Sequence, residues 1–194
     1  LRAIAMAQNS GFERLNIDLM HGLPNQTRAQ AINDLEIAIE TGATHLSWYQ
    51  LTIEPNTAFY SKPPILPIED QVADIQDLGQ QTLGDAGFVQ YEISAFAQDA
   101  ERCNHNINYW QFGDYLGIGA GAHGKITLPG QNKIIRTAKT RQPNHYLSHK
   151  TTALASSQPI TRDQLPLEFM MNALRLASGT SDDLFAARTG LLPK

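Results

Sequence analysis

The chain has 194 residues, 42% of them hydrophobic, and a formal net charge of −4. That length can bury one good core and a small second unit, and the weak negative charge gives no sign of nucleic-acid or membrane-surface binding. No run of 18 apolar residues occurs and one cysteine is present, so we expect no transmembrane segment, no disulfide framework and a cytoplasmic location.

The two ends of the sequence predict a fragment of a longer protein. The chain begins without methionine, at Leu1, inside a helical pattern that runs to Asn9 and is closed by Gly11. It stops at Lys194, shortly after another helix signal. We therefore expect that an N-terminal part of the protein precedes these residues.

Strand and helix signals alternate over the first half of the chain. Thr27 is the expected N-cap of one helix, and a proline-rich loop follows the second strand. The expected strands cover residues 15–20, 45–53 and 87–93, and the helices between them cover residues 27–40 and 69–85. Alternation of this kind predicts parallel βα units, and hence an α/β layer or a barrel segment with both faces of the sheet covered.

The second half has a different character. Residues 125–139 read as a hairpin around a Pro-Gly turn, and residues 143–160 are polar and read as a linker. An amphipathic helix starts at Leu165 and ends at Gly179, and Ser181 caps a further helix. We therefore expect a barrel part with a hairpin extension over residues 1–142, a linker over 143–160, and the start of a truncated helical domain over 161–194.

A glycine-rich stretch, residues 119–124, fits the pattern GxGxxG. The dinucleotide-binding reading needs a helix after it and an acidic residue about 20 positions on. Two short strands are expected instead, and position 139 is Lys. We reject that reading. The glycines let the backbone pass close either to a ligand or to a neighbouring strand. The whole stretch 103–124 is accordingly either a pocket wall or a tightly packed barrel end.

Polar residues at the ends of the predicted strands are candidate site residues, since functional groups gather at the carboxyl ends of strands in parallel α/β folds. Asp18 stands out, because a carboxylate in an apolar strand is costly unless it is paired or bonds a ligand. An ion pair with Lys or Arg from a neighbouring strand is the alternative. Thr52 and Glu54 follow the second strand, and Glu92 lies on the third, where it could simply be solvated.

Other kinds of site find little support in the sequence. His145 and His149 are four residues apart but lack a nearby carboxylate, which favours a surface face over a metal site. No nucleophile elbow or P-loop occurs. Cys103 lies close to His105, but closeness in sequence says little about a nucleophile and its base.

Four stretches together closely resemble one family, the oxygen-independent coproporphyrinogen III oxidase-like radical S-adenosylmethionine proteins. They occur in one order, and the third is similar to the heme chaperone branch of that family in particular. The stretches are NIDLMHGLPNQT (16–27), LSWYQLTIEPNT (46–57), HNINYW (105–110) and GDYLGIG (113–119).

The resemblance implies the later half of a partial (β/α) barrel that holds a 4Fe–4S cluster and S-adenosylmethionine. The family's cluster ligands are a CxxxCxxC motif, which is absent here, so the preceding part of the protein would have to supply it. By motif matching, Asp18 should bond the ribose of S-adenosylmethionine, the backbone near Met20 should approach the adenine, and Thr52 should lie on the same wall.

The third stretch implies heme binding through His105, Asn106, Tyr109 and Trp110. A neutral imidazole suits iron and aromatic faces suit a flat macrocycle, so His105 is a candidate axial ligand. A structural histidine that bonds a backbone carbonyl is the rival interpretation. Two functions stay open: a heme chaperone that delivers heme to an acceptor protein, and an oxidase that decarboxylates a porphyrinogen. Only the second would make the protein a radical enzyme of porphyrin synthesis.

Overall fold

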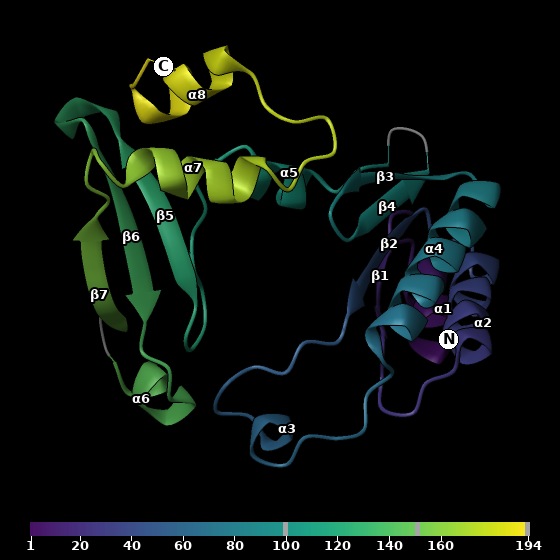
Figure 1. Ribbon diagram of the computed structural model, residues 1–194. Coiled ribbons are helices and arrows are strands. Elements are labelled where there is room, and N and C mark those ends of the chain that lie inside the picture. The colour runs from purple at the N-terminus through teal and green to yellow at the C-terminus, as the bar shows by residue number, and fades with distance from the viewer. Residues whose placement is uncertain (99–100, 150–151, 193–194) are drawn as a thin grey trace. The chain divides into compact units, whose positions relative to one another are not determined.

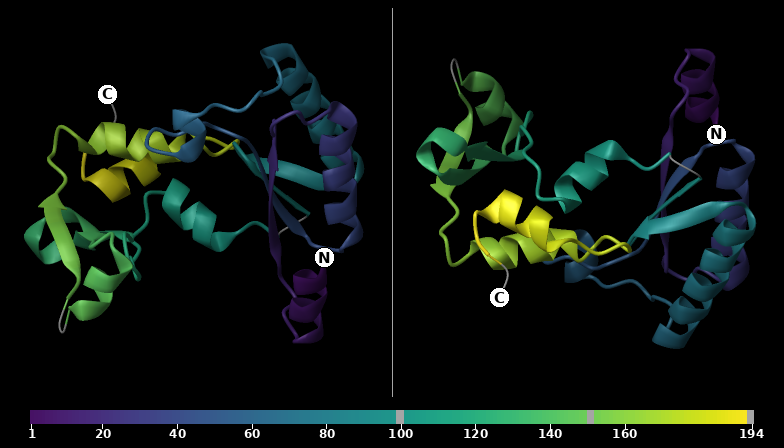
Figure 2. Two further views of the ribbon diagram at one scale, coloured as in Figure 1. Left: turned by 90° about the horizontal axis from the view of Figure 1, so that it is seen from below. Right: turned by 90° about the horizontal axis from the view of Figure 1, so that it is seen from above.

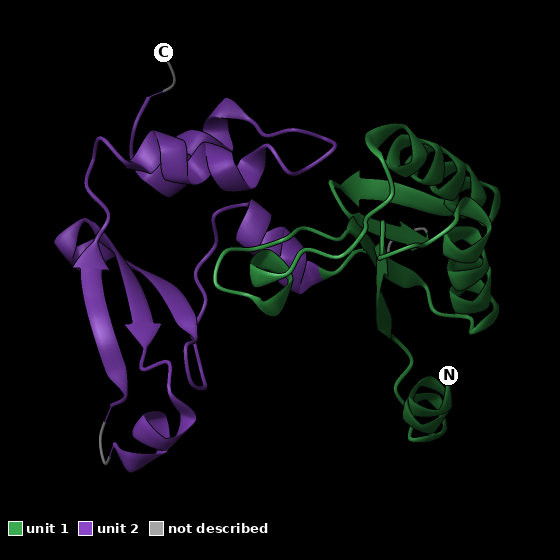
Figure 3. Ribbon diagram, turned by 60° about the horizontal axis from the view of Figure 1, so that its bottom comes forward, with its two compact units in different colours: residues 1–103 green, residues 104–194 purple. Residues whose placement is uncertain are grey.

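The structure is a computed structural model that describes residues 1–98, 101–149 and 152–192. The chain forms two compact units, residues 1–103 and residues 104–194 (Figure 3), and each unit has a sheet of its own. The division therefore lies after Cys103, whereas the sequence placed the end of the barrel part at residue 142.

The elements of the first unit lie where the hydrophobic periodicity predicts them, with two additions. The short helix α3 interrupts the proline-rich loop, and a fourth strand, β4, follows β3. In chain order the unit contains α1 (Arg2–Asn9), β1 (Asn16–His21), α2 (Arg28–Glu40), β2 (His45–Gln50), α3 (Ala58–Ser61), α4 (Glu69–Asp85), β3 (Phe88–Glu92) and β4 (Ala95–Gln98).

The sheet of this unit is mixed, in the order β1-β2-β4-β3. β1 and β2 are parallel, as predicted, with Asn16 opposite His45. β4 was not predicted, and it runs antiparallel to both β2 and β3. The expectation of a wholly parallel sheet is therefore wrong at this point, although β1, β2 and β3 do run in one direction.

Helices α2 and α4 pack side by side on one face of the sheet (Figures 1 and 2). Thr27 starts α2 as predicted: its side chain accepts from the backbone N–H of Gln30, and the Gln30 side chain accepts from the N–H of Thr27. The apolar side chains of the strands meet the helices here. The core of the unit consists of Ala31, Leu35, Ala38, Leu46, Trp48, Ile75, Leu83, Phe88 and Phe96, with Ile17 and Leu19 packed against it.

The other face of the sheet carries the alternate side chains of each strand. Here β1 presents Asn16, Asp18 and Met20, while β2 presents His45, Ser47 and Tyr49 in register with them. Asp18 and Met20 thus share the face that points away from Ile17 and Leu19. This face, called the polar face below, is the part of the unit that concerns function.

The second unit is built on an antiparallel sheet of three strands in the order β5-β6-β7. The predicted hairpin is confirmed as β5 and β6, joined through a 3-10 turn at Pro129–Gln131. Residues 143–160, expected as a linker, include a helix and the third strand. In chain order the unit contains α5 (Asn104–Trp110), β5 (His123–Leu128), β6 (Lys133–Lys139), α6 (Pro143–Ser148), β7 (Leu154–Pro159), α7 (Leu165–Ala173) and α8 (Asp182–Thr189).

Helices α7 and α8 close the core of this unit. Ser181 caps α8 as predicted, its hydroxyl accepting from the N–H of Leu184. The α7 side chains of Leu165, Phe169 and Ala173 are buried, and Phe112 joins them from the segment after α5. The core comprises Phe112, Ile134, Leu165, Phe169, Ala173 and Phe185. In the part of the chain that the structure describes, no helix is long and apolar enough to cross a bilayer.

Strand packing accounts for Gly124 at the end of the glycine-rich stretch and for Gly117 before it, whereas Gly119 and Gly121 have positive φ angles. No helix follows the stretch, because β5 begins at His123, and Tyr115 forms an antiparallel bridge with Lys125. A Cβ on Gly117 would strike the backbone of His123, and one on Gly124 would lie 2.7 Å from the Thr137 hydroxyl. Two backbone segments therefore cross here without room for side chains, which is the neighbouring-strand alternative.

Candidate functional site

A chain of side-chain hydrogen bonds crosses the polar face of the first unit. The Asn16 amide nitrogen donates to the Asp18 carboxylate at 2.7 Å. The Asn16 amide oxygen lies 2.6 Å from His45 Nδ1 and accepts from the Ser47 hydroxyl at 3.1 Å. His45 Nε2 lies 2.8 Å from the Tyr91 hydroxyl. Three strands thus contribute to one polar network.

The chemistry of the groups fixes the direction of each bond. An ionised carboxylate only accepts, so Asn16 must turn its NH₂ group toward Asp18 and its oxygen toward His45. An amide oxygen only accepts, so His45 must carry its proton on Nδ1. Its Nε2 then accepts the hydrogen bond that the Tyr91 hydroxyl donates. Every donor in the network therefore points from Tyr91 toward Asp18.

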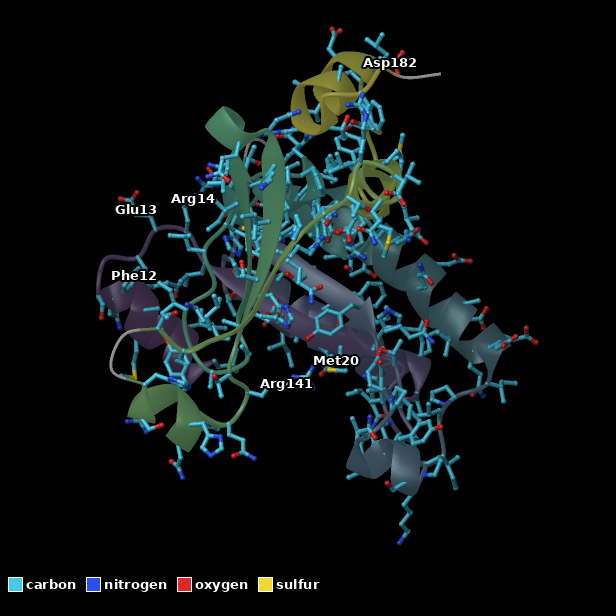
Figure 4. The ribbon with its side chains drawn as sticks, turned by 90° about the vertical axis from the view of Figure 1, so that its left-hand side faces the viewer. Phe12, Glu13, Arg14, Met20, Arg141 and Asp182 are labelled. Atoms are coloured by element: carbon cyan, nitrogen blue, oxygen red, sulfur yellow. The ribbon has the colours of Figure 1, made fainter. Side chains whose placement is uncertain are left out.

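The inner half of the network is buried and its outer half is exposed. His45 is 5% and Tyr91 is 3% exposed, whereas Asn16 and Asp18 reach solvent. Burial lowers the pKa of His45 and outweighs the opposing effect of Asp18, while Arg14 lowers that pKa further. Arg14 lies on the segment after α1 (Figure 4) and pairs with Glu101. The histidine is accordingly neutral near pH 7.

The predicted cofactor residues lie on or next to this face. Asp18 has no Lys or Arg partner among the described residues, so the ion-pair alternative finds no support there. Met20 is half-buried at the end of β1 (Figure 4), opposite Tyr49 of β2. Thr52 is exposed just beyond the end of β2.

The acidic residues of the other strand ends have structural surroundings. Glu92 is buried, so the alternative of a solvated carboxylate is wrong, and its carboxylate accepts from the backbone N–H of Ser94 at 3.2 Å in the β3–β4 turn. Glu54 is exposed, and its carbonyl accepts from the Thr57 hydroxyl that caps α3. Neither carboxylate belongs to the polar network of Asp18.

In the second unit, the predicted heme residues lie on α5. The rings of His105 and Tyr109 meet edge to face at 4.7 Å, one helical turn apart. Tyr109 in turn packs on Tyr115 with ring centroids 4.2 Å apart. His105 is exposed, and no described residue hydrogen-bonds its ring, so the rival interpretation of a histidine bound to a carbonyl is not supported. We call these three rings the aromatic ladder.

Two arginines border the aromatic ladder. Arg136 of β6 donates to the Tyr115 hydroxyl at 3.3 Å and pairs with Glu168 of α7 through two nitrogens. Burial by itself lowers the pKa of Arg136, but the bond to Glu168 and the charge of that carboxylate raise the pKa above its usual range. Arg175 stacks over the Trp110 ring at 4.3 Å, and the buried ring nitrogen of Trp110 has no hydrogen-bond partner among the described residues.

An ion pair between a buried lysine and a partly exposed aspartate anchors the segment between α5 and β5. Lys125, which is 2% exposed, donates to Asp114 at 3.0 Å and lies 4.2 Å over the Phe112 ring. Asp114 also accepts from the N–H and hydroxyl of Thr127. Burial lowers the pKa of Lys125, whereas the bonds from Thr127 and Lys125 lower that of Asp114 despite partial burial. The anchor holds Tyr115, the third ring of the aromatic ladder, next to Lys125.

Ligands for an iron–sulfur cluster do not gather on this chain. The described residues contain no group of three or more His, Cys, Asp or Glu side chains that could hold a metal ion. Cys103 is the sole cysteine of the sequence, and a cluster needs several thiolates. His145 and His149 are exposed, in agreement with the surface interpretation.

Comparison with known proteins identifies relatives of this chain. No family model matches the sequence. The chain is 49% identical over 190 residues to the heme chaperone HemW of Escherichia coli (strain K12), covering 98% of this chain and 50% of that protein. This chain is homologous to HemW. A match at 32% identity over 188 residues to HemW of Bacillus subtilis (strain 168) covers 95% of this chain and 49% of that protein.

The chain thus spans about half the length of the HemW proteins it matches. The fold agrees with part of a solved structure, that of coproporphyrinogen III oxidase (HemN) from Escherichia coli, described as a radical SAM enzyme. The TM-score is 0.74 at 20% sequence identity, covering 98% of this chain and 46% of that one. The predicted fold class, an α/β fold that corresponds to part of the HemN fold, is confirmed.

The network around Asp18 was missed in part by sequence reasoning. Asn16, His45, Ser47 and Tyr91 belong to it, but only Asp18 was singled out. Asn16 could have been found, because it lies two positions before Asp18 and shares its face of the strand. The contribution of Tyr91 depends on how β3 and β4 are ordered in the sheet, which the sequence does not reveal.

Proposed function

We propose that the protein carrying this chain binds heme and delivers it to an acceptor protein. The aromatic ladder is the observation that supports this most directly. It offers an exposed imidazole at His105 and ring surface at Tyr109. An imidazole nitrogen suits the iron of heme, and flat apolar surface suits its macrocycle.

Homology supports the same proposal. The HemW proteins of Escherichia coli and Bacillus subtilis, at 49% and 32% identity, are named heme chaperones. Asn106 and Trp110 flank the aromatic ladder on α5 and complete the predicted heme set. Heme or a porphyrinogen is thus the proposed small-molecule partner. A cytoplasmic location is part of the proposal and is supported by the low cysteine content.

We further propose that Asp18, Met20 and Thr52 form part of an S-adenosylmethionine site. The fit is chemical: Asn16 occupies one Asp18 oxygen, and the other has no partner among the described residues, so it can accept from ribose hydroxyls. S-adenosylmethionine bound to a reduced 4Fe–4S cluster supplies radical chemistry when both are present. The residues of this chain do not fit the cluster, whose ligands would have to come from outside it.

The alternative function is that of an oxygen-independent coproporphyrinogen III oxidase. The likeness to HemN is one of fold and does not favour that activity over heme transfer. The discriminating experiment is a heme titration of the whole protein alongside an anaerobic assay for porphyrinogen decarboxylation. Stoichiometric heme binding without decarboxylation supports the chaperone, and turnover of the porphyrinogen supports the oxidase.

The role of His105 is tested by His105→Ala in the whole protein. If this imidazole binds iron, the Soret band of the heme complex should shift and the affinity for heme should fall. His145→Ala is the matched control, since that histidine is exposed on α6, outside the aromatic ladder. An unchanged spectrum and affinity in His105→Ala would remove the axial ligand from the proposal.

A further inference from the structure

We propose that Asn16 and His45 are positioning residues for Asp18, which hold its carboxylate in one orientation for the hydroxyl groups of a bound ribose. The inference rests on the proposed S-adenosylmethionine site and names residues that this site depends on. It is carried by the hydrogen-bond network of the polar face.

The sheet places these residues with little freedom. Parallel register sets Asn16 beside His45 and Asp18 beside Ser47. On the next strand, β4, the residues opposite His45 and Ser47 are Ala97 and Ala95. These methyl groups leave the space above β4 open, so the Tyr91 side chain reaches from β3 across to His45.

Burial makes the inner part of this network rigid. His45 and Tyr91 are nearly inaccessible, and each polar atom of the imidazole has a partner. The backbone N–H of Cys103 also approaches the Tyr91 oxygen, at 3.4 Å, and Arg102 lies 5.8 Å from the centroid of its ring. Removal of one partner would leave a buried polar group without a bond, so the geometry resists rearrangement.

This rigidity is transmitted to an exposed residue. Asp18 alone would sample several rotamers, because its side chain lies on the solvent side of the strand. Asn16 limits that freedom, and Asn16 is itself held by His45 and Ser47 at its amide oxygen. One carboxylate oxygen is thereby occupied and the second is presented outward. A fixed acceptor of this kind suits the adjacent hydroxyls of a ribose.

The network could also serve stability alone, and a binding experiment separates the two roles. The whole protein, reconstituted anaerobically, is titrated with S-adenosylmethionine and with its 2′-deoxyribose counterpart. Asp18→Asn should weaken binding of S-adenosylmethionine and reduce the preference for it over the deoxy compound. His45→Phe, which keeps a ring but removes both hydrogen bonds, should weaken binding by about fivefold to tenfold and reduce the same preference.

Two further variants make the test specific. His45→Asn retains a donor near the position of Nδ1 and should recover most of the affinity. In the Asp18→Asn background, His45→Phe should cause no additional loss, because its effect acts through Asp18. Unchanged affinity in His45→Phe, or the same loss with and without Asp18, would overturn the positioning role. Unchanged affinity in Asp18→Asn would instead refute the proposed site and the inference with it.

A measurement on the unaltered protein covers the case in which His45→Phe does not fold. Correlation of imidazole nitrogens with ring protons in protein labelled with ¹⁵N-histidine identifies the tautomer. We expect His45 to be neutral with its proton on Nδ1, as the donor directions require. A proton on Nε2 would mean that His45 does not donate to Asn16, and the positioning inference would be wrong.

Discussion

The close packing of α4 on the sheet predicts that Gly79→Ala destabilises the protein, although alanine is the better helix former. Gly79 lies in the middle of α4 and faces Trp48 of β2, which is 4% exposed. A Cβ at position 79 would lie no more than 2.7 Å from three atoms of the indole ring. Ordinary carbon contacts are about 3.5–4.0 Å, so either the ring or the helix must move.

The size of the effect follows from two opposing contributions. Replacing glycine by alanine within a helix gains about 1 kcal/mol. Overpacking a well-filled core costs about 1–3 kcal/mol, and more where the neighbour cannot give way. The Trp48 ring also packs against the His21 ring at 4.2 Å and the Phe96 ring at 6.4 Å, so it has little room to move. The cost of overpacking at this site should therefore be about 3 kcal/mol, the upper end of that range. We expect a net loss of about 2 kcal/mol.

The same helix offers a matched control. Gly84 has no atom within 4 Å of its ideal Cβ, and its backbone is not left-handed. Gly84→Ala should therefore stabilise the protein by about 0.5–1 kcal/mol. Urea unfolding followed by circular dichroism measures both variants. A Gly79→Ala protein as stable as the unaltered chain would refute the argument from packing.

Three further predictions concern charge and metal content. Burial lowers the pKa of both His21 and His45, so the unfolded state takes up protons first as the pH falls. The urea concentration at the unfolding midpoint should therefore be constant above about pH 6.5 and should decrease as the pH falls below 6.5. The same midpoint at pH 5.5 as at pH 7 would contradict this prediction. Asp114→Asn should cost about 3 kcal/mol in unfolding experiments, because it leaves Lys125 buried without its counter-ion, whereas Lys125→Met should cost clearly less; equal losses would contradict the ion-pair argument. Purified alone and reconstituted anaerobically, this chain should contain no iron–sulfur cluster by iron and sulfide analysis, because Cys103 is its single cysteine. One cluster per chain would contradict this prediction.

The regular elements could be predicted because their periodicity reflects burial on one face. Thr27 and Ser181 marked helix starts through the same hydrogen bonds that the structure shows. β4 was missed because it is only four residues long and follows β3 through a turn without glycine or proline. α5 was missed because Asn, His, Tyr and Trp are weak helix formers, so tertiary packing must stabilise it.

The candidate site was predictable only where one residue conflicts with its surroundings. Asp18 is such a residue, since a carboxylate breaks an apolar strand pattern. His45 does not conflict with anything nearby in sequence, and its partners Asn16 and Tyr91 are 29 and 46 residues away. Strand register and strand order bring them together, and both are decided by the whole sheet. The heme residues were found by resemblance, and their role stays a prediction.

The position of β1 in the sheet has a practical consequence. It forms one margin of the four strands, so the outward peptide groups of Asn16–His21 have no strand beside them within the described sheet. No proline or lysine interrupts that segment, and these are the residues that usually discourage a foreign strand from docking. We therefore expect molecules of this chain, purified by itself, to associate through β1 at high protein concentration while both units are still folded.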